Sequence, residues 1–156
     1  MSFVIRDATT VDIPNIIEAY QWLFQSPGGV PPGWDETRAR ESIAETIEGS
    51  ESTYLVAIHS LDARLAGICS AYMDINSVRY GRRCWIEDLA VAPEMRSKGL
   101  GRQLIGEVRT WARERGATHL ELDTGKARDD ARRFYEQLEP DQITIGYGWN
   151  LAPGAD

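Results

Sequence analysis

Several residue types that mark specialised protein classes are scarce in this chain. Two cysteines, Cys69 and Cys84, are too few for a disulfide framework, so we expect free thiols with a structural role. No apolar run approaches the ~18 residues of a membrane span, and Arg6 and Asp7 cut short the apolar N-terminus before a signal peptide forms. These absences predict a cytoplasmic protein that makes no contact with a membrane.

Positive charge and histidine are also scarce. The formal net charge of −7 argues against nucleic acid as a partner, because nucleic-acid binding needs a basic face. The two histidines, His59 and His119, lack the spacing of metal ligands, so no metal site is expected. With 42% hydrophobic and 26% charged residues, the composition is typical of one globular domain, which we expect to span residues 1–156.

The order of the expected elements predicts the fold class. Alternating and β-rich sequence predicts strands over residues 3–6, 53–59, 65–74, 84–91, 118–123 and 142–149. Apolar residues at helical spacing predict helices over residues 13–24, 36–48, 100–115 and 127–138. Hairpins come first and a crossover helix follows, so we expect an α/β (α+β) fold with a mixed, mostly antiparallel sheet of six to seven strands and four helices on both faces.

One segment carries the strongest functional signal. Residues 86–102 are expected to form a buried strand, a short turn and the start of a long amphipathic helix. Glycines in the turn let the backbone approach a ligand, and the first turn of the helix presents free N–H groups at the positive end of the helix dipole. Since Arg96, Lys98 and Arg102 add positive charge, the segment predicts a phosphate-binding site.

Two known phosphate-binding patterns do not fit this turn. The third glycine of the dinucleotide fingerprint G-x-G-x-x-G would fall on Leu104, and G-x-x-x-x-G-K-[ST] occurs nowhere in the chain. Arg96, Gly99 and Gly101 instead match the R-x-x-G-x-G segment of the GNAT superfamily of N-acetyltransferases, which this turn resembles. The resemblance extends to the strand sequence at residues 89–94 and the helix sequence at residues 131–136.

The resemblance implies acetyl-CoA as the cofactor, bound along a strand that is splayed from its neighbour. A backbone N–H near Leu89 then faces the thioester carbonyl. Two positions depart from the family pattern, since Arg128 replaces a common asparagine and Glu139-Pro140 replaces Gly-Phe. The implied cofactor-binding residues are Leu89, Ala90, Val91, Arg96, Ser97, Lys98, Gly99, Leu100, Gly101, Arg102 and Arg128.

Two adjacent carboxylates, Glu87 and Asp88, lie within the apolar strand before the turn. In a regular strand they point to opposite faces, so Glu87 shares a face with Trp85, and Asp88 shares the other with Ile86. A carboxylate at such a position is costly unless it is paired or functional, and a salt bridge is the structural alternative. The Ile-Glu-Asp-Leu order resembles the polyamine- and diamine-acetylating GNAT enzymes, which implies Glu87 as general base through a water and Asp88 as the residue that orients the acceptor.

Tyr135 is the candidate general acid. The helix that contains it carries an apolar stripe, so a core tyrosine is the alternative. The resembling family has a tyrosine at this position beside the thiol sulfur. A phenol with a pKa of about 10 can protonate a departing thiolate whose conjugate acid has a pKa of about 8.5.

Trp34 and Asp35 are the candidate acceptor-binding residues. They follow a Pro/Gly-rich loop and combine an aromatic ring with a carboxylate, which suits a cationic amine; a helix start with an exposed aromatic ring is the alternative. We therefore expect acetyl-CoA-dependent transfer to a primary amine of a small molecule, such as a polyamine, a diamine, an amino acid or an aminoglycoside-like compound, by direct attack in a ternary complex.

Two other functions stay open: a non-catalytic acyl-CoA-binding or regulatory module, and a protein or peptide N-acetyltransferase. The closing strand expected over residues 142–149 alternates large apolar residues with glycine and threonine, which gives it one apolar face. Members of the resembling family often pair through such C-terminal strands. We therefore expect a homodimer.

Overall fold

The computed structural model describes residues 2–153. The chain divides into two compact units, one that ends at Leu122 and one that begins at Asp123. The first unit contains the β-sheet, and the second contains a helix and the C-terminal segment.

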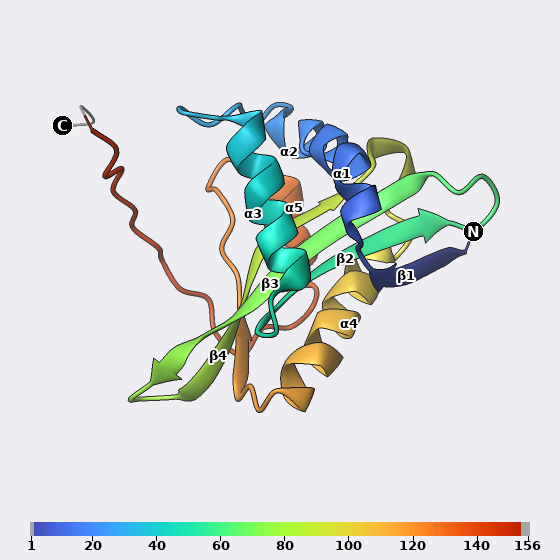
Figure 1. Cartoon of the computed structure of the whole chain (residues 1–156). Helices are drawn as coiled ribbons and strands as arrows, with labels where there is room; N and C mark the ends of the chain where they lie inside the picture. The colour runs from blue at the N-terminus through green and yellow to red at the C-terminus, as the bar shows by residue number, and fades with distance from the viewer. Residues whose placement is uncertain (1, 154–156) are drawn as a thin grey trace. The chain divides into compact units, whose positions relative to one another are not determined.

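A five-stranded sheet with the order β1-β2-β3-β4-β5 forms the centre of the first unit. Neighbouring strands from β1 to β4 are antiparallel, and β5 runs parallel to β4 (Figure 1). The mixed, mostly antiparallel character that the sequence predicts is therefore confirmed. The strands are β1 Phe3–Asp7, β2 Ser52–His59, β3 Leu65–Ser77, β4 Gly81–Val91 and β5 His119–Glu121.

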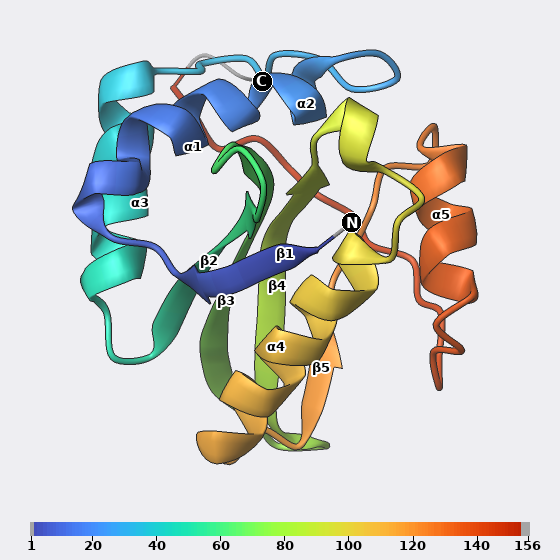
Figure 2. The same cartoon turned by 90° about the vertical axis from the view of Figure 1, so that its right-hand side faces the viewer.

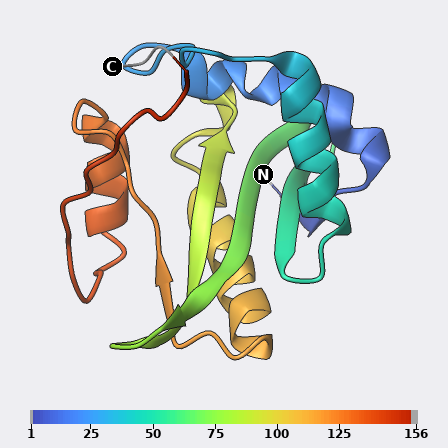
Figure 3. The same cartoon turned by 60° about the vertical axis from the view of Figure 1, so that its left-hand side comes forward.

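Helices cover both faces of this sheet. Helices α1 and α3 lie across one face and α4 across the other (Figures 1 and 2), and Figure 3 shows α4 behind the long β3–β4 pair. No helix among residues 2–153 combines the length and the apolar character needed to cross a membrane. The helices of this unit are α1 Ile13–Ala19, α2 Gln21–Phe24, α3 Glu36–Glu48 and α4 Leu100–Glu114, with short 3₁₀ helices η1 Thr10–Asp12 and η2 Pro93–Met95.

The core lies between these helices and the sheet. All residues from Thr53 to Ala57 in β2 are buried, because the strand is covered on both faces and needs no polar side. Cys69 and Cys84 are buried free thiols, as the sequence predicts. The apolar stripe of α4 supplies Leu100, Leu104, Ile105, Val108 and Ala112, and the opposite layer supplies Ile16, Ile17, Ala19 and Ile43.

The β3–β4 hairpin is longer than the sequence predicts. The sequence predicts strands over residues 65–74 and 84–91, but β3 continues to Ser77 and β4 begins at Gly81. Arg83 explains part of this difference, because its guanidinium forms ion pairs with Asp74 in β3 and with Glu121 in β5. Cross-strand ion pairs of this kind allow polar residues to remain in strands.

The second unit contains α5, Asp129–Glu136, and no strand among its described residues, 123–153. The predicted strand over residues 142–149 is therefore wrong, and the sheet has five strands instead of six to seven. Alternation alone does not make a strand, because the backbone also needs a hydrogen-bonded neighbour. The large apolar side chains from Ile143 to Leu151 are 71% to 91% exposed.

Candidate active site

The outer edge of β4 is only partly paired. β4 pairs with β3 up to Val91, whereas its ladder with β5 covers only Arg83, Cys84 and Trp85. From Ile86 onward, no strand among the described residues pairs with this edge, so its backbone groups lack a ladder partner on that side. This is the separation of two strands that the family resemblance implies.

A tight turn connects β4 to α4. After η2, Ser97 and Gly99 adopt left-handed backbone conformations with φ of 61° and 81°. Gly99 is the N-cap of α4, and no atom of the described residues other than its own and those of its two chain neighbours lies within 4 Å of the place where its Cβ would be. The backbone N–H of Gln103 donates to the carbonyl of Gly99 (3.1 Å), so the N–H groups of the preceding helical residues have no partner within the helix.

The turn also carries positive charge. Arg96, Lys98 and Arg102 are exposed, and Nε of Arg96 donates to the carbonyl of Val91 at the end of β4 (3.2 Å). The helix N-terminus and these cations fit a pyrophosphate, and the partly paired edge of β4 fits the extended, amide-bearing arm of acetyl-CoA. The structure thus brings together the predicted cofactor residues 89–91 and 96–102.

A β-bulge in β4 changes the relation between the two carboxylates. Ser70 pairs with Asp88, but the next residue of β3, Ala71, pairs with Ile86, so Glu87 is the extra residue. Adjacent residues of β3 point to opposite faces, and their partners Asp88 and Ile86 do the same. The prediction that Asp88 and Ile86 share a face is therefore wrong, because the bulge resets the alternation.

The same bulge brings Glu87 and Asp88 to one face. Trp85 pairs with Tyr72, which lies two residues from Ser70, so Trp85 shares the face of Asp88. Nε1 of Trp85 donates to Oε2 of Glu87 (3.0 Å), which places the Glu87 carboxylate beside this indole. Glu87 is exposed and Asp88 is half-buried, so the two carboxylates have different environments on the same side of the sheet.

Asp88 is held by a tyrosine from the first helical segment. The hydroxyl of Tyr20, between α1 and α2, donates to Oδ2 of Asp88 (2.7 Å), and the hydroxyl of Tyr54 in β2 donates to Tyr20 (2.9 Å). Burial raises the pKa of Asp88, and the hydrogen bond from Tyr20 opposes this shift. The sequence does not mark either tyrosine as a site residue; a hydroxyl in an otherwise apolar stretch is the only local signal.

Trp34 completes an aromatic cluster with Tyr20 and Phe24. Its ring centroid lies 4.9 Å from that of Phe24 and 5.9 Å from that of Tyr20. Asp35 has a different position, because it is the N-cap of α3 and accepts a hydrogen bond from the backbone N–H of Arg38 (3.1 Å). The structure therefore brings Trp34 next to the Asp88 network and uses Asp35 to begin a helix.

Two predicted site residues lie in the second unit. Tyr135 is half-buried on α5, and its ring centroid lies 5.1 Å from that of Phe134. Arg128 is the N-cap of α5 and is also half-buried; its carbonyl accepts a hydrogen bond from the backbone N–H of Arg132 (3.0 Å). Their roles as general acid and as cofactor contact stay predictions.

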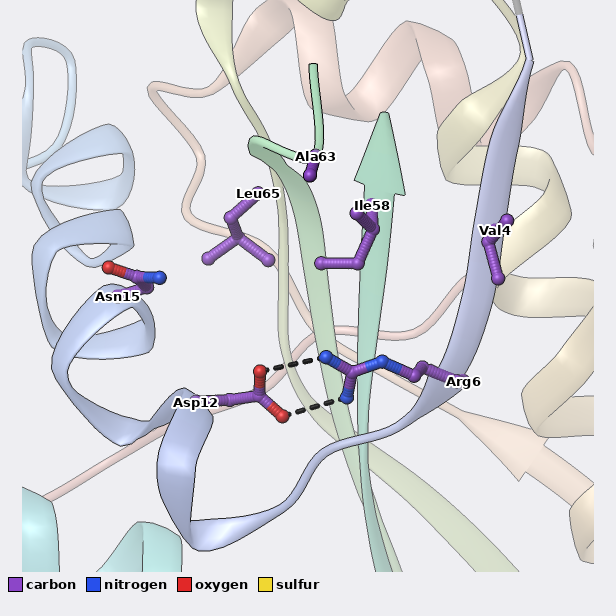
Figure 4. Close-up of a pocket in the computed structure, with 7 residues that line it drawn as sticks. All are labelled: Val4, Arg6, Asp12, Asn15, Ile58, Ala63 and Leu65. Carbon is purple, nitrogen blue, oxygen red and sulfur yellow. Dashed lines mark hydrogen bonds and ion pairs between the residues drawn. The ribbon is translucent and has the colours of Figure 1, made fainter. Parts of the chain in front are cut away.

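A pocket of about 380 Å³ lies elsewhere in the first unit (Figure 4). Within it, Arg6 and Asp12 form a two-point ion pair (2.8 and 2.9 Å), and the hydrogen bond from Arg6 lowers the pKa of Asp12. These charges satisfy each other and link β1 to η1, so the pocket offers no free charge to a ligand. Its lining residues are Val4, Arg6, Asp12, Asn15, Ile58, Ala63 and Leu65.

The sequence profile of the acetyltransferase (GNAT) family matches residues 14–139, a range that includes β4, the turn and α5. The chain belongs to the GNAT family. The predicted family is therefore confirmed, and acetyl-CoA is the cofactor that GNAT acetyltransferases use.

Individual relatives agree with this assignment. The uncharacterised N-acetyltransferase YhfO of Bacillus subtilis strain 168 is 33% identical over 152 residues, which covers 94% of this chain and 97% of YhfO. YhdJ of the same organism, also an uncharacterised N-acetyltransferase, is 36% identical over 91 residues, which covers 58% of this chain and 63% of YhdJ. The chain therefore spans less than two thirds of the length of YhdJ.

The same fold occurs in a solved acetyltransferase. The aminoglycoside N-acetyltransferase AAC(6')-Iy, in complex with CoA, superposes with a TM-score of 0.80 at 16% identity and covers 97% of this chain and 95% of that one. This similarity confirms the predicted GNAT-like fold, and the sheet of this protein has five strands.

Proposed function

We propose that this GNAT protein is an acetyl-CoA-dependent N-acetyltransferase that acetylates a primary amine of a small molecule. One observation carries the proposal: the partly paired edge of β4 leads directly into the left-handed turn and the N-terminus of α4. A single strand and turn can thus hold both the arm and the phosphates of acetyl-CoA. The aminoglycoside N-acetyltransferase of the same fold supports a small-molecule amine as acceptor.

When bound, acetyl-CoA supplies an acetyl group that is activated as a thioester. Asp88 orients the acceptor, and Glu87 takes a proton from its ammonium group through a water, which frees the nitrogen electron pair for attack. The backbone N–H near Leu89 stabilises the negative charge on the carbonyl oxygen. As the C–S bond breaks, the hydroxyl of Tyr135 would give its proton to the departing sulfur, and the second proton lost by the acceptor nitrogen would return to the Tyr135 oxygen.

The second part of the proposal is a homodimer. The apolar side chains from Ile143 to Leu151 are exposed, and an exposed apolar surface of this kind is typical of an interaction site. A second copy of the chain supplies the same surface, as a symmetric interface requires.

A thiol-release assay with acetyl-CoA tests the proposed activity. The acceptor panel contains polyamines, diamines, amino acids, aminoglycosides and peptides, at equal concentration of primary amine. We expect release of CoA thiol that depends on one class of small-molecule amine. Tight CoA binding with only slow, amine-independent release would instead indicate a binding module, and release with peptides alone would indicate a protein acetyltransferase.

A further inference from the structure

Three side chains that lie far apart in the sequence form one hydrogen-bonded chain beneath the aromatic cluster. Tyr54 donates to Tyr20 at 2.9 Å, and Tyr20 donates to Oδ2 of Asp88 at 2.7 Å. Tyr54 is 3% exposed and Tyr20 and Asp88 are half-buried, so solvent competes little for these hydrogen bonds. An ionised carboxylate can only accept, so Tyr20 donates its one hydroxyl proton to Asp88 and accepts from Tyr54. The series of hydrogen bonds therefore ends on Asp88.

Glu87 adds a second carboxylate on the same face of the sheet, and the other titratable groups that face Asp88 are neutral. They are Tyr20 from the α1–α2 junction, Tyr54 from β2 and Cys69 from β3, and burial raises the pKa of all three above its ordinary value. Among residues 2–153, no lysine, arginine or histidine forms an ion pair with Asp88. An ionised Asp88 thus accepts a hydrogen bond from Tyr20 but has no ion-pair partner among the described residues.

A half-buried carboxylate without a cation is costly for the fold. The cost is offset when a cation arrives from outside, and the aromatic cluster beside Asp88 favours such a cation. Tyr20 belongs to both groups, since its ring lies 5.9 Å from Trp34 and 6.2 Å from Phe24 while its hydroxyl contacts the carboxylate. Aromatic faces attract ammonium groups, and a carboxylate pairs with them.

We propose that Tyr20, supported by Tyr54, is a positioning residue that holds Asp88 to receive the acceptor as its ammonium cation. Tyr20 occupies Oδ2 and leaves Oδ1 for an N–H of the acceptor. The inference rests on the proposed acetyl transfer, and it restricts the acceptor to amines that are protonated when they bind. Proton removal then falls to Glu87, so loss of Tyr20 affects acceptor binding and not the chemical step.

The first test needs no turnover. The pKa of Asp88 is measured by NMR titration of its side-chain carboxyl carbon in the wild type and in Tyr20→Phe. Because the hydrogen bond from Tyr20 lowers this pKa, we expect it to be higher in Tyr20→Phe, with a smaller rise in Tyr54→Phe. Tyr80→Phe is the control, since Tyr80 is an exposed tyrosine that takes no part in the hydrogen bonds between Tyr54, Tyr20 and Asp88. Butylammonium, as a probe, should lower the Asp88 pKa in the wild type.

The second test uses the amine found in the thiol-release assay. In Tyr20→Phe, we expect KM for the amine to rise by about five- to tenfold and kcat to stay within about twofold, as expected for loss of a hydrogen bond to a charged group that acts only in binding. The acidic limb of 1/KM should move to higher pH in step with the Asp88 pKa.

Separate results decide the inference and the proposed function. An Asp88 pKa that is the same in wild type and Tyr20→Phe, or that does not respond to butylammonium, overturns the inference. A fall in kcat with unchanged KM also overturns it. If no amine is acetylated but the NMR shifts occur as expected, the cation site stands and the proposed acetyl transfer fails.

Discussion

Two glycines at opposite ends of α4 form a matched pair for testing the phosphate-binding turn. Gly99 has a φ of 81° and Gly116 has a φ of 80°, and in both cases no described residue beyond the chain neighbours has an atom within 4 Å of the place where a Cβ would be. Alanine at either position therefore meets the same backbone strain and no steric clash. That strain is about 1–2 kcal/mol for an L-residue in the left-handed region.

The two substitutions should differ in where the strain appears. In Gly116→Ala it remains in the folded protein, so Tm should fall by about 2–4 °C per kcal/mol for a chain of this size, and Gly99→Ala should lose less Tm because its exposed turn can relax. In Gly99→Ala, the free turn can relax away from the left-handed conformation, and CoA binding must then restore it. If the whole strain of about 1–2 kcal/mol appears in binding, Kd rises about 5- to 30-fold.

Isothermal titration calorimetry with CoA measures the change in affinity, and thermal unfolding shows that both variants are folded and how much strain each retains. Gly116→Ala should bind CoA with the affinity of the wild type. Wild-type affinity in a Gly99→Ala variant whose Tm is close to that of the wild type would refute the assignment of this turn to the phosphates, because the relaxed turn would then bind CoA without being restored.

The other predictions concern the catalytic residues and assembly. Glu87→Gln keeps the shape of the side chain but takes no proton, so kcat should fall by roughly 10²–10⁴-fold; the loss should be smaller at high pH, and a variant with full activity removes Glu87 from the mechanism. Tyr135→Phe should lower kcat by roughly 10²-fold with little change in CoA affinity. That loss should shrink with a thioester whose leaving thiol has a lower pKa; a stability loss of about 1 kcal/mol without an activity change would make Tyr135 a core residue instead. Light scattering at micromolar concentration should give the mass of a dimer, and a monomer mass would contradict the role proposed for residues 143–151.

The turn and α4 are predictable from the sequence because their signals are local. A stripe of apolar residues begins at Leu100, and the glycines before and after it are the residues that adopt a left-handed conformation at Gly99 and Gly116. The anion site follows from these local features, because the first turn of any α-helix lacks partners for its N–H groups.

Strand pairing is less predictable because it depends on distant partners. Residues 142–149 alternate like a strand, but pairing needs a neighbour that the alternation does not specify. The bulge at Glu87 is hidden for the same reason, since it arises from the register between β3 and β4 and reverses the expected face of Asp88 relative to Ile86. A strand register that is wrong by one residue therefore places Glu87 and Asp88 on opposite faces when they lie on the same one.

The hydrogen bonds that join Tyr54, Tyr20 and Asp88 are also hard to predict from the sequence, because they depend on distant side chains. Tyr20 fits the apolar stripe of its helix, and Tyr54 fits a buried strand, so both look like core residues in the sequence. Only the packing of the α1–α2 junction over β4 brings the Tyr20 hydroxyl to Asp88. The sequence identifies the carboxylate, and the fold identifies the groups that hold it.

The most direct test of the proposed activity uses acetyl-CoA with a deuterium-labelled acetyl group and follows the label by mass spectrometry. The proposed mechanism predicts that the label appears on the nitrogen of a primary amine, with one acetylated amine formed for each CoA thiol released. Thiol release without a labelled amine, or label on a hydroxyl group, would contradict it.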